Sequence, residues 1–434
     1  MSREYEVQGL GVGELAEEFG TPLYIYDGDL LRDRLLELRH QLHPGLTILY
    51  SLKANPNVSV CALLGAHGAG AEVSSLAELV TAELAGVPAG DTVFLGPGKS
   101  VEELSACLER GLYAVICESF QELALLDRLA AEQRVQVSVA LRVNPSFEVK
   151  GAGLTMGGKP RQFGIDEAQL LAERDLPKRF RNLRLMGVQA YLGTRILDEK
   201  LIAENTRRIL DLAVVISSTC GFDLEMVDIG GGAGVAYFDG ERDLDLTALA
   251  SAMNGHLAAF ARDHPTTRMV MELGRYLTAP AGMYVVRVRY TKTSYGERFA
   301  ITDGGTNHHM AAVGIGSFVK RNFPMALLNR IDEPPSQTWH IAGPLCTPND
   351  TLGKKVRLPP VEPGDLIGVL RSGAYGPSAS PGLFLSHGFP AEVLVRDGTA
   401  HLIRRRDRPA DLLDKQYPAP VTQPRIRSVS GRAG

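Results

Sequence analysis

The chain has 434 residues, which is enough for two or three domains with a large buried core. Its 46 lysine and arginine residues against 50 aspartate and glutamate residues give a formal net charge of −4, which argues against a nucleic-acid-binding protein. With 44% hydrophobic and 22% charged residues, the composition is typical of a folded globular protein and excludes a disordered one.

The chain carries no feature that points to a membrane or to secretion. Its first residues are charged, and the apolar stretch 212–216 is far shorter than the roughly 20 residues of a membrane span. The five cysteines are an odd number without a close pair, which favours a reducing compartment over a disulfide framework or a zinc site. We expect a soluble cytoplasmic protein with no membrane, nucleic-acid or metal partner.

From about residue 46 to residue 275, short apolar runs alternate with polar or glycine-rich turns and amphipathic stretches. Strands that alternate with helices predict a parallel sheet, and eight of them favour a (β/α)8 barrel over an open sheet. Ser75 and Ser119 precede two of the helical stretches, where they are expected to cap the helix. The predicted strands are 46–52, 70–73, 92–95, 114–117, 135–143, 185–192, 226–229 and 269–273.

After Arg275 the pattern changes to strand-like runs such as 284–290 and 391–395, which predict an antiparallel β domain. From about Tyr417 the chain has little that could pack. The predicted division is a barrel over 28–278, a β domain over 1–27 and 279–412, and a mobile tail over 413–434.

Barrel enzymes place their chemistry at the C-terminal ends of the strands. The residues expected there are strongly polar: Lys53, Glu72, Ser75, Lys99, Glu118, Arg142, Asn144, Tyr191, Asp228, Glu272 and Arg275. A lysine in such a place can be nucleophilic and can form a Schiff base with an aldehyde, as with pyridoxal 5′-phosphate. For a lysine on its own, a structural ion pair is the alternative.

Two glycine-rich turns invite a nucleotide interpretation, and both fail it. Gly96–Ser100 ends like a Walker A loop, but Val93 stands where the first glycine is required. Gly230–Gly234 lacks the last small residue of a dinucleotide fingerprint, because position 235 is valine. Three consecutive glycines at a strand end still suit one phosphate group, with a tight turn as the alternative. A phosphate site on a later strand favours the cofactor interpretation of Lys53.

Five segments now carry a resemblance: Tyr50–Asn55, Asp228–Gly232, Glu272–Arg275, Cys346 with Asp350, and Gly373–Tyr375. They occur in the same order as in the fold type III pyridoxal-phosphate decarboxylases, which the chain resembles over about residues 20–400. This family includes diaminopimelate, ornithine and arginine decarboxylases. The resemblance implies an alanine-racemase-like barrel with a C-terminal β domain, pyridoxal 5′-phosphate as cofactor, and a homodimer with shared active sites.

The resemblance also implies residue roles. Lys53 would hold the cofactor as a Schiff base, Glu272 would keep the ring nitrogen protonated, and Cys346 of the partner subunit would return a proton to the substrate. Without the motif, Cys346 would be interpreted as a small buried residue. The residues expected to bind the cofactor are Lys53, Glu72, Tyr191, Thr194, Gly230, Gly231, Gly232, Glu272, Gly274, Arg275 and Tyr375. Those expected to bind the substrate are Arg142, Cys346, Asp350 and Tyr375.

The chain departs from the family pattern near the cofactor at two places. Tyr191 and Thr194 replace the histidine and serine of a His-x-Gly-Ser pattern, which keeps a ring that can stack and a hydroxyl for the phosphate. Glu72 stands where an aspartate is usual, so the charge is kept but reaches one methylene further.

The departures from diaminopimelate decarboxylases are larger. Thr347 replaces the glutamate that meets the distal amino group, residues 308–312 replace the Arg-Pro pair for the distal carboxylate, and 382–385 replace a Tyr-Asn pair. We therefore expect an acylated or carrier-bound amino acid as substrate, in a specialised biosynthetic pathway. Residues 193–198 resemble members that act on a carrier-bound glutamyl group, as in butirosin biosynthesis. A free diamino acid such as diaminopimelate is the alternative.

Proteins of other classes share parts of this pattern. Alanine racemase has an arginine at the ring nitrogen, so Glu272 favours decarboxylation, and single-domain cofactor-binding proteins lack the β domain that supplies Cys346. A non-catalytic regulatory homologue is the remaining alternative. The presence of Lys53, Glu272 and Cys346 together argues against it. His308, His309 and His387 have no assigned role and are expected at the surface or rim of the β domain.

Overall fold

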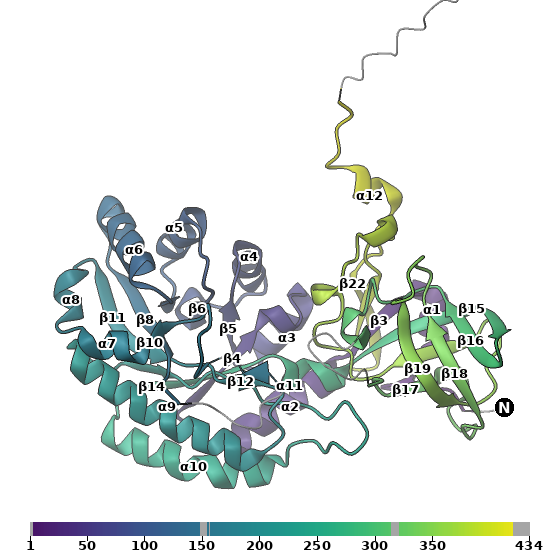
Figure 1. The fold of residues 1–434 in the computed structure, drawn as a ribbon, viewed down its shortest axis with the longest axis horizontal. Helices are drawn as coiled ribbons and strands as arrows, with labels where there is room; N and C mark the ends of the chain where they lie inside the picture. Colours follow the sequence, from purple (N-terminus) through teal and green to yellow (C-terminus); the bar gives the residue numbers. More distant parts are fainter. Residues whose placement is uncertain (1–2, 148–153, 156, 314–320, 420–434) are drawn as a thin grey trace, which may run out of the picture.

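The computed structural model describes residues 3–147, 154–155, 157–313 and 321–419. In this part of the chain, eight parallel strands form a closed barrel, in which β8 pairs with β7 and β14 pairs with β4 (Figure 1). The predicted barrel is confirmed, and strand ends differ from those expected by three residues at most. The strands are β4 (Leu46–Ser51), β5 (Gly70–Val73), β6 (Thr92–Phe94), β7 (Ala114–Cys117), β8 (Val137–Asn144), β11 (Leu183–Gln189), β13 (Met226–Asp228) and β14 (Arg268–Leu273).

Helices surround the barrel and alternate with its strands (Figure 1). The Ser75 and Ser119 hydroxyls accept hydrogen bonds from the backbone N–H groups of Glu78 and Glu122, which confirms the expected caps. The helices are α2 (Gly28–Gln41), α3 (Val58–Ala66), α4 (Leu76–Leu84), α5 (Val101–Arg110), α6 (Phe120–Gln133), α7 (Glu167–Ala172), α8 (Leu176–Arg179), α9 (Glu199–Cys220), α10 (Leu246–Asp263) and α11 (Arg275–Thr278).

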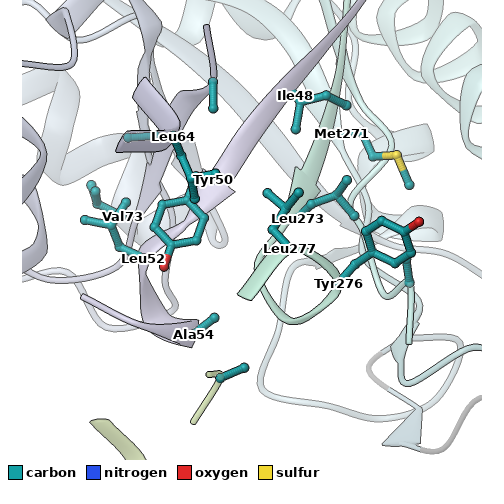
Figure 2. Close-up of a cluster of buried hydrophobic side chains, with 14 of the residues drawn as sticks. Ile48, Tyr50, Leu52, Ala54, Leu64, Val73, Met271, Leu273, Tyr276 and Leu277 are labelled. Atoms are coloured by element: carbon teal, nitrogen blue, oxygen red, sulfur yellow. The ribbon is translucent and has the colours of Figure 1, made fainter. Parts of the chain in front are cut away.

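Buried side chains fix the end of β4, where the chain turns toward the barrel opening. Figure 2 shows Tyr50 and Leu52 from this region beside Val73 of β5. Tyr50 is almost fully buried, and its hydroxyl donates a hydrogen bond to the Asn55 carbonyl at 2.6 Å. Because burying a large apolar side chain contributes about 1.5–3 kcal/mol, these contacts hold the short 3-10 turn η1 (Leu52–Ala54) in place.

A second sheet forms the β domain on the other side of the molecule (Figure 1). It is mostly antiparallel, as expected, and the runs 284–290 and 391–395 lie in β15 and β21. β3 lies inside this sheet between two neighbours, antiparallel to β15 and parallel to β21. Its strands are β3 (Leu23–Asp27), β15 (Gly282–Ser294), β16 (Glu297–Thr302), β17 (Met325–Leu327), β18 (Gln337–Ala342), β19 (Thr351–Leu358), β20 (Leu366–Val369), β21 (Ala391–Arg396) and β22 (Thr399–Arg404).

We propose the division into 28–278 for the barrel and 1–27 with 279–412 for the β domain, since β3 belongs to the second sheet. Two short helices flank the sheet of the β domain: α1 (Val12–Phe19) near the N-terminus and α12 (Pro409–Leu413) after β22. The tail expected over 413–434 lies outside the described residues from position 420 on. No helix in the described ranges has the length and apolar character to cross a membrane.

The expectation that His308 and His309 lie at the surface or rim is wrong. Both are buried, because the β domain supplies hydrogen-bond partners for their rings. His308 contacts the Tyr284 hydroxyl at 3.0 Å and the Gly388 carbonyl at 2.8 Å, and His309 contacts the Ser372 hydroxyl at 2.7 Å. Burial lowers the pKa of both histidines to about 4, so both rings are neutral at pH 7. His387 is exposed.

Candidate active site

Lys53 lies between two carboxylates at the barrel opening. Its Nζ atom donates to Glu72 Oε2 at 2.8 Å and lies 3.8 Å from Glu272 Oε2. The barrel order β14, β4, β5 explains this meeting, because Glu272 pairs with Leu49 and Glu72 pairs with Ser51 in adjacent strands. The predicted clustering of these three residues at the strand ends is therefore what the structure has.

Burial and neighbouring charges together set the pKa values of this cluster. Burial alone would lower the pKa of Lys53, but the Glu72 and Glu272 carboxylates outweigh it and raise the pKa above its usual range. Burial would raise the pKa of Glu72, yet its ion pair with Lys53 lowers it. For Glu272, burial and then the charge of Glu72 raise the pKa. The cluster thus holds a charged lysine against an ionised Glu72.

Glu272 has two buried polar neighbours. Gln189 Nε2 donates to Glu272 Oε1 at 2.8 Å. The Asp228 carboxyl is also buried, and its Oδ2 atom has no hydrogen-bond partner among the described residues. Burial, and then the charge of Glu272, raise the pKa of Asp228 well above its usual range, which favours the protonated form of this carboxyl. Asp228 Oδ1 accepts the backbone N–H of Gly230 at 2.8 Å, so it also anchors the glycine turn.

Replacing Asp228 with asparagine is expected to stabilise the protein more at pH 8 than at pH 5. The folded-state pKa of Asp228 lies above the unfolded value, so the folded state holds the extra proton and loses stability as the pH rises above about 4. This loss is about 1.4 kcal/mol per pH unit until the folded-state pKa is reached. Asparagine keeps the shape and the oxygen that accepts the Gly230 N–H, but it has no proton to lose. Denaturant unfolding of cofactor-free wild type and variant at both pH values measures the difference, and an equal difference at both would contradict the assigned proton.

The turn after β13 brings backbone close to the site. Gly232 has φ +98°, and a Cβ atom there would lie 2.1 Å from the Gly193 carbonyl oxygen. A Cβ atom on Gly231 would lie 1.8 Å from the Glu272 carbonyl oxygen. Larger residues would therefore push this turn away from β14 and out of the pocket.

Predicted cofactor residues from distant parts of the chain line one pocket. Arg275 Nη1 donates to the Tyr237 hydroxyl at 3.1 Å, its guanidinium lies 4.5 Å from the centre of the Tyr375 ring, and its buried Nε has no partner among the described residues. An unpartnered buried guanidinium nitrogen beside a glycine turn fits a phosphate group. The pocket contains Lys53, Tyr191, Thr194, Gly232, Glu272, Gly274, Arg275 and Tyr375.

The residues present fit pyridoxal phosphate. Lys53 would supply the amine for its aldehyde, Arg275 and the glycine turn would supply donors for its phosphate, and Glu272 would supply a carboxylate for its ring nitrogen. Tyr191 lies beside Lys53, with the ring centre 5.9 Å from Nζ, where an aromatic face can stack on a cofactor ring.

Comparison with known proteins agrees with this chemistry. Residues 29–279 match the family model of the pyridoxal-dependent decarboxylases, over their pyridoxal-binding domain. The chain belongs to this family. A pyridoxal-dependent decarboxylase releases the carboxylate of an amino acid with pyridoxal phosphate as cofactor, so the expected enzyme class and cofactor are confirmed.

Two relatives in this family differ in substrate. The decarboxylase is 39% identical to an L-glutamyl-[BtrI acyl-carrier protein] decarboxylase of Niallia circulans, over 93% of this chain and 95% of the other. It is 30% identical to a diaminopimelate decarboxylase of Aquifex aeolicus, over 93% of both chains. Among solved structures, a diaminopimelate decarboxylase from Methanocaldococcus jannaschii in complex with L-lysine matches with a TM-score of 0.87 at 28% identity over 96% of both chains.

Three residues expected to contact the substrate lie away from the pocket lining. Arg142 is buried and donates to Glu118 at 2.8 Å. Asp350 is buried, and its carboxylate accepts bonds from Thr306 and from the Leu345 backbone, so it ties two loops of the β domain together. Cys346 is exposed on the loop between β18 and β19. Their expected roles remain proposals.

The sequence did not single out Gln189 and Tyr237. Gln189 is fully buried at the end of β11, and a polar residue inside a predicted strand is a signal that could have marked it. Tyr237 follows the glycine turn without any motif, and only its contact with Arg275 reveals its place.

Proposed function

We propose that this decarboxylase acts on an amino acid whose distal end is acylated or attached to a carrier protein, in a biosynthetic pathway. One observation carries the proposal: none of the three departures from the diaminopimelate pattern offers a charge for a free distal group. The His308 and His309 rings are buried and neutral, Thr347 has no charge, and 383–385 are exposed apolar residues. The relative named for a carrier-bound glutamyl group supports the same substrate class.

The chemistry restricts how such a substrate is attached. Decarboxylation needs a free α-amino group and a free α-carboxylate, so a glutamyl group on a carrier must be linked through its side-chain carboxyl. Loss of carbon dioxide and addition of one proton at Cα then give a 4-aminobutanoyl group on the carrier. The carboxylate of free glutamate that a distal pocket would have to neutralise is absent in this substrate, which agrees with the uncharged distal residues.

Different residues of the chain have different roles in this reaction. Pyridoxal phosphate, when bound, would supply an acceptor for the electron pair of the bond between Cα and the carboxylate. Glu272, held by Gln189, would keep a proton near the ring nitrogen, and Arg275 with the glycine turn would hold the phosphate end in place. Lys53 provides the amine, and Glu72 accepts its hydrogen bond.

We also propose a homodimer in which Cys346 serves the active site of the partner subunit. The loop that carries Cys346 belongs to the β domain, and Cys346 is exposed and absent from the lining of the Lys53 pocket in its own chain. A thiol placed there can deliver the proton that Cα gains only if a second subunit brings it to the site.

A panel of substrates tests the proposed function. We expect the cofactor-loaded enzyme to release carbon dioxide from side-chain-linked glutamyl thioesters at a kcat/KM at least about 100-fold above that for free glutamate, diaminopimelate, lysine or ornithine. Mass spectrometry of the products and detection of carbon dioxide measure the turnover of the thioesters and of the free amino acids. Efficient release from free diaminopimelate, to whose decarboxylases the chain is 30% identical, would instead support the free diamino acid alternative.

A further inference from the structure

A row of three arginines leads from the Lys53 pocket to the surface. Arg275 lies in the pocket, and its guanidinium lies 5.7 Å from the centre of the Tyr237 ring. Arg195 lies 5.6 Å from the same ring and 5.0 Å from that of Phe238. Arg321 lies 4.5 Å from the Phe238 ring. The two ring centres are 6.1 Å apart, so the aromatic pair spaces the arginines along a path.

The side chains become more exposed along this path. Arg275 and Arg195 are both partly buried, with the Arg195 side chain 28% exposed, and the side chain of Arg321 at the outer end is 56% exposed. Tyr237 itself is buried between the arginines, so a substrate that extends outward from the pocket would pass Arg195 and then Arg321 beside it. Neither residue belongs to the machinery assigned above.

The positive charge at Arg195 and Arg321 is poorly neutralised. Among the described residues, the only carboxylate within 4 Å of either guanidinium is Glu241, at 3.9 Å from Arg195 and 3.6 Å from Arg321. The other oxygen of Glu241 accepts the backbone N–H groups of Tyr237 and Phe238. Burial, and then the charge of Arg275, lower the pKa of Arg195. One carboxylate at long range leaves both guanidinium groups with donors to offer an anion.

The backbone directs Arg195 to this place at a cost. Arg195 has φ +60°, the left-handed conformation that non-glycine residues rarely adopt. The next residue is held on the glycine turn, since the Ile196 N–H donates to the Gly232 carbonyl and the Gly234 N–H donates to the Ile196 carbonyl. The same turn that faces the cofactor phosphate thus fixes the position of Arg195.

We propose that Arg195 and Arg321 bind the phosphate of the pantetheine arm that carries a thioester-linked substrate into the pocket. The inference rests on the proposed function, because only a carrier-bound substrate brings such an arm. A phosphodiester has one negative charge and oxygens that match the planar donors of arginine. Arg275 remains with the cofactor, and the two outer arginines hold the arm where it leaves the pocket.

Two thioesters that differ only by one phosphate test the proposal. The side-chain-linked glutamyl thioesters of 4′-phosphopantetheine and of pantetheine are compared by kcat/KM on the cofactor-loaded enzyme. We expect wild type to prefer the phosphorylated thioester by about 10-fold or more, and the double variant Arg195→Gln/Arg321→Gln to lose this preference through its KM. The single variant Arg321→Gln, in which only the outer arginine is replaced, is expected to lose part of this preference for the phosphorylated thioester.

Arg262→Gln is the matched control, because it removes an exposed arginine of α10 and the same unit of charge. It should keep the preference. Equal turnover of the two thioesters by wild type, or a preference retained in the double variant, would overturn the inference and leave the proposed function standing. Loss of bound pyridoxal phosphate in Arg195→Gln, measured by absorbance after dialysis, would assign this arginine to the cofactor phosphate and also overturn it. Turnover of free amino acids alone would overturn both proposals.

Discussion

Replacing Lys53 with alanine is expected to lower the rate of carbon dioxide release by about 1,000-fold or more, because the pocket then lacks the amine that holds the cofactor aldehyde and moves protons near Cα. The loss should appear in kcat. The fold should survive, since the neighbouring Leu52 and Ala54, and not Lys53, fill the core at this turn. Borohydride reduction of the loaded enzyme followed by peptide mass spectrometry should find the cofactor on Lys53 in wild type and not in the variant.

Lys178→Ala is the control for this experiment, because Lys178 has an exposed side chain on α8 and does not line the Lys53 pocket. It should keep wild-type activity and cofactor content. If Lys53→Ala retained activity within 10-fold of wild type, or if reduction fixed the cofactor on another lysine, the assignment of Lys53 would be wrong.

Replacing Cys346 with alanine is expected to lower kcat by about 100- to 10,000-fold, because a proton donor to Cα is lost. Cofactor binding should remain, since Cys346 does not line the pocket of its own chain. The serine variant should recover part of the activity, with a changed dependence of kcat on pH. Stopped assays of carbon dioxide release and the visible absorption of bound cofactor separate the two effects.

Mixing the two inactive variants tests the shared site directly. Random assembly of Lys53→Ala with Cys346→Ala subunits makes half of the dimers hybrid, and each hybrid has one site with both residues, so about a quarter of wild-type activity should return. Each variant mixed with itself should stay inactive. If Cys346 served the site of its own chain, no hybrid would have a complete site and the mixture would remain inactive.

The barrel was predictable because each strand is a short apolar run that ends in a polar or glycine-rich turn. The ends of the strands were less predictable, as the predicted strand 185–192 shows. The observed strand β11 ends at Gln189, but Ala190 and Leu192 are also buried and extend the apolar run into the loop. Burial and strand pairing coincide only in part, so an apolar run marks the core more reliably than it marks the end of a strand.

The charged centre of the site was predictable as well, since Lys53, Glu72 and Glu272 each follow or end a strand of the same barrel. Residues that act on this centre through contacts between distant segments were not. Tyr237 and Arg195 are brought to Arg275 by the folding of separate loops. Arg195 follows the Tyr191–Thr194 pattern, but that pattern does not mark the arginine itself, and no motif marks Tyr237. His308 and His309 were misplaced for the same reason, because the groups that satisfy them, at Ser372 and Gly388, lie far along the chain.

The position of β3 has a consequence for synthesis of the chain on the ribosome. β3 is made before the barrel, but its neighbours in the sheet, β15 and β21, begin only at Gly282 and Ala391. Both edges of an apolar strand must therefore wait unpaired while more than half of the polypeptide emerges. The barrel can close first, and the β domain becomes complete only when the last strands arrive. Nascent chains halted before residue 391 should accordingly be the ones that depend most on chaperones to avoid aggregation.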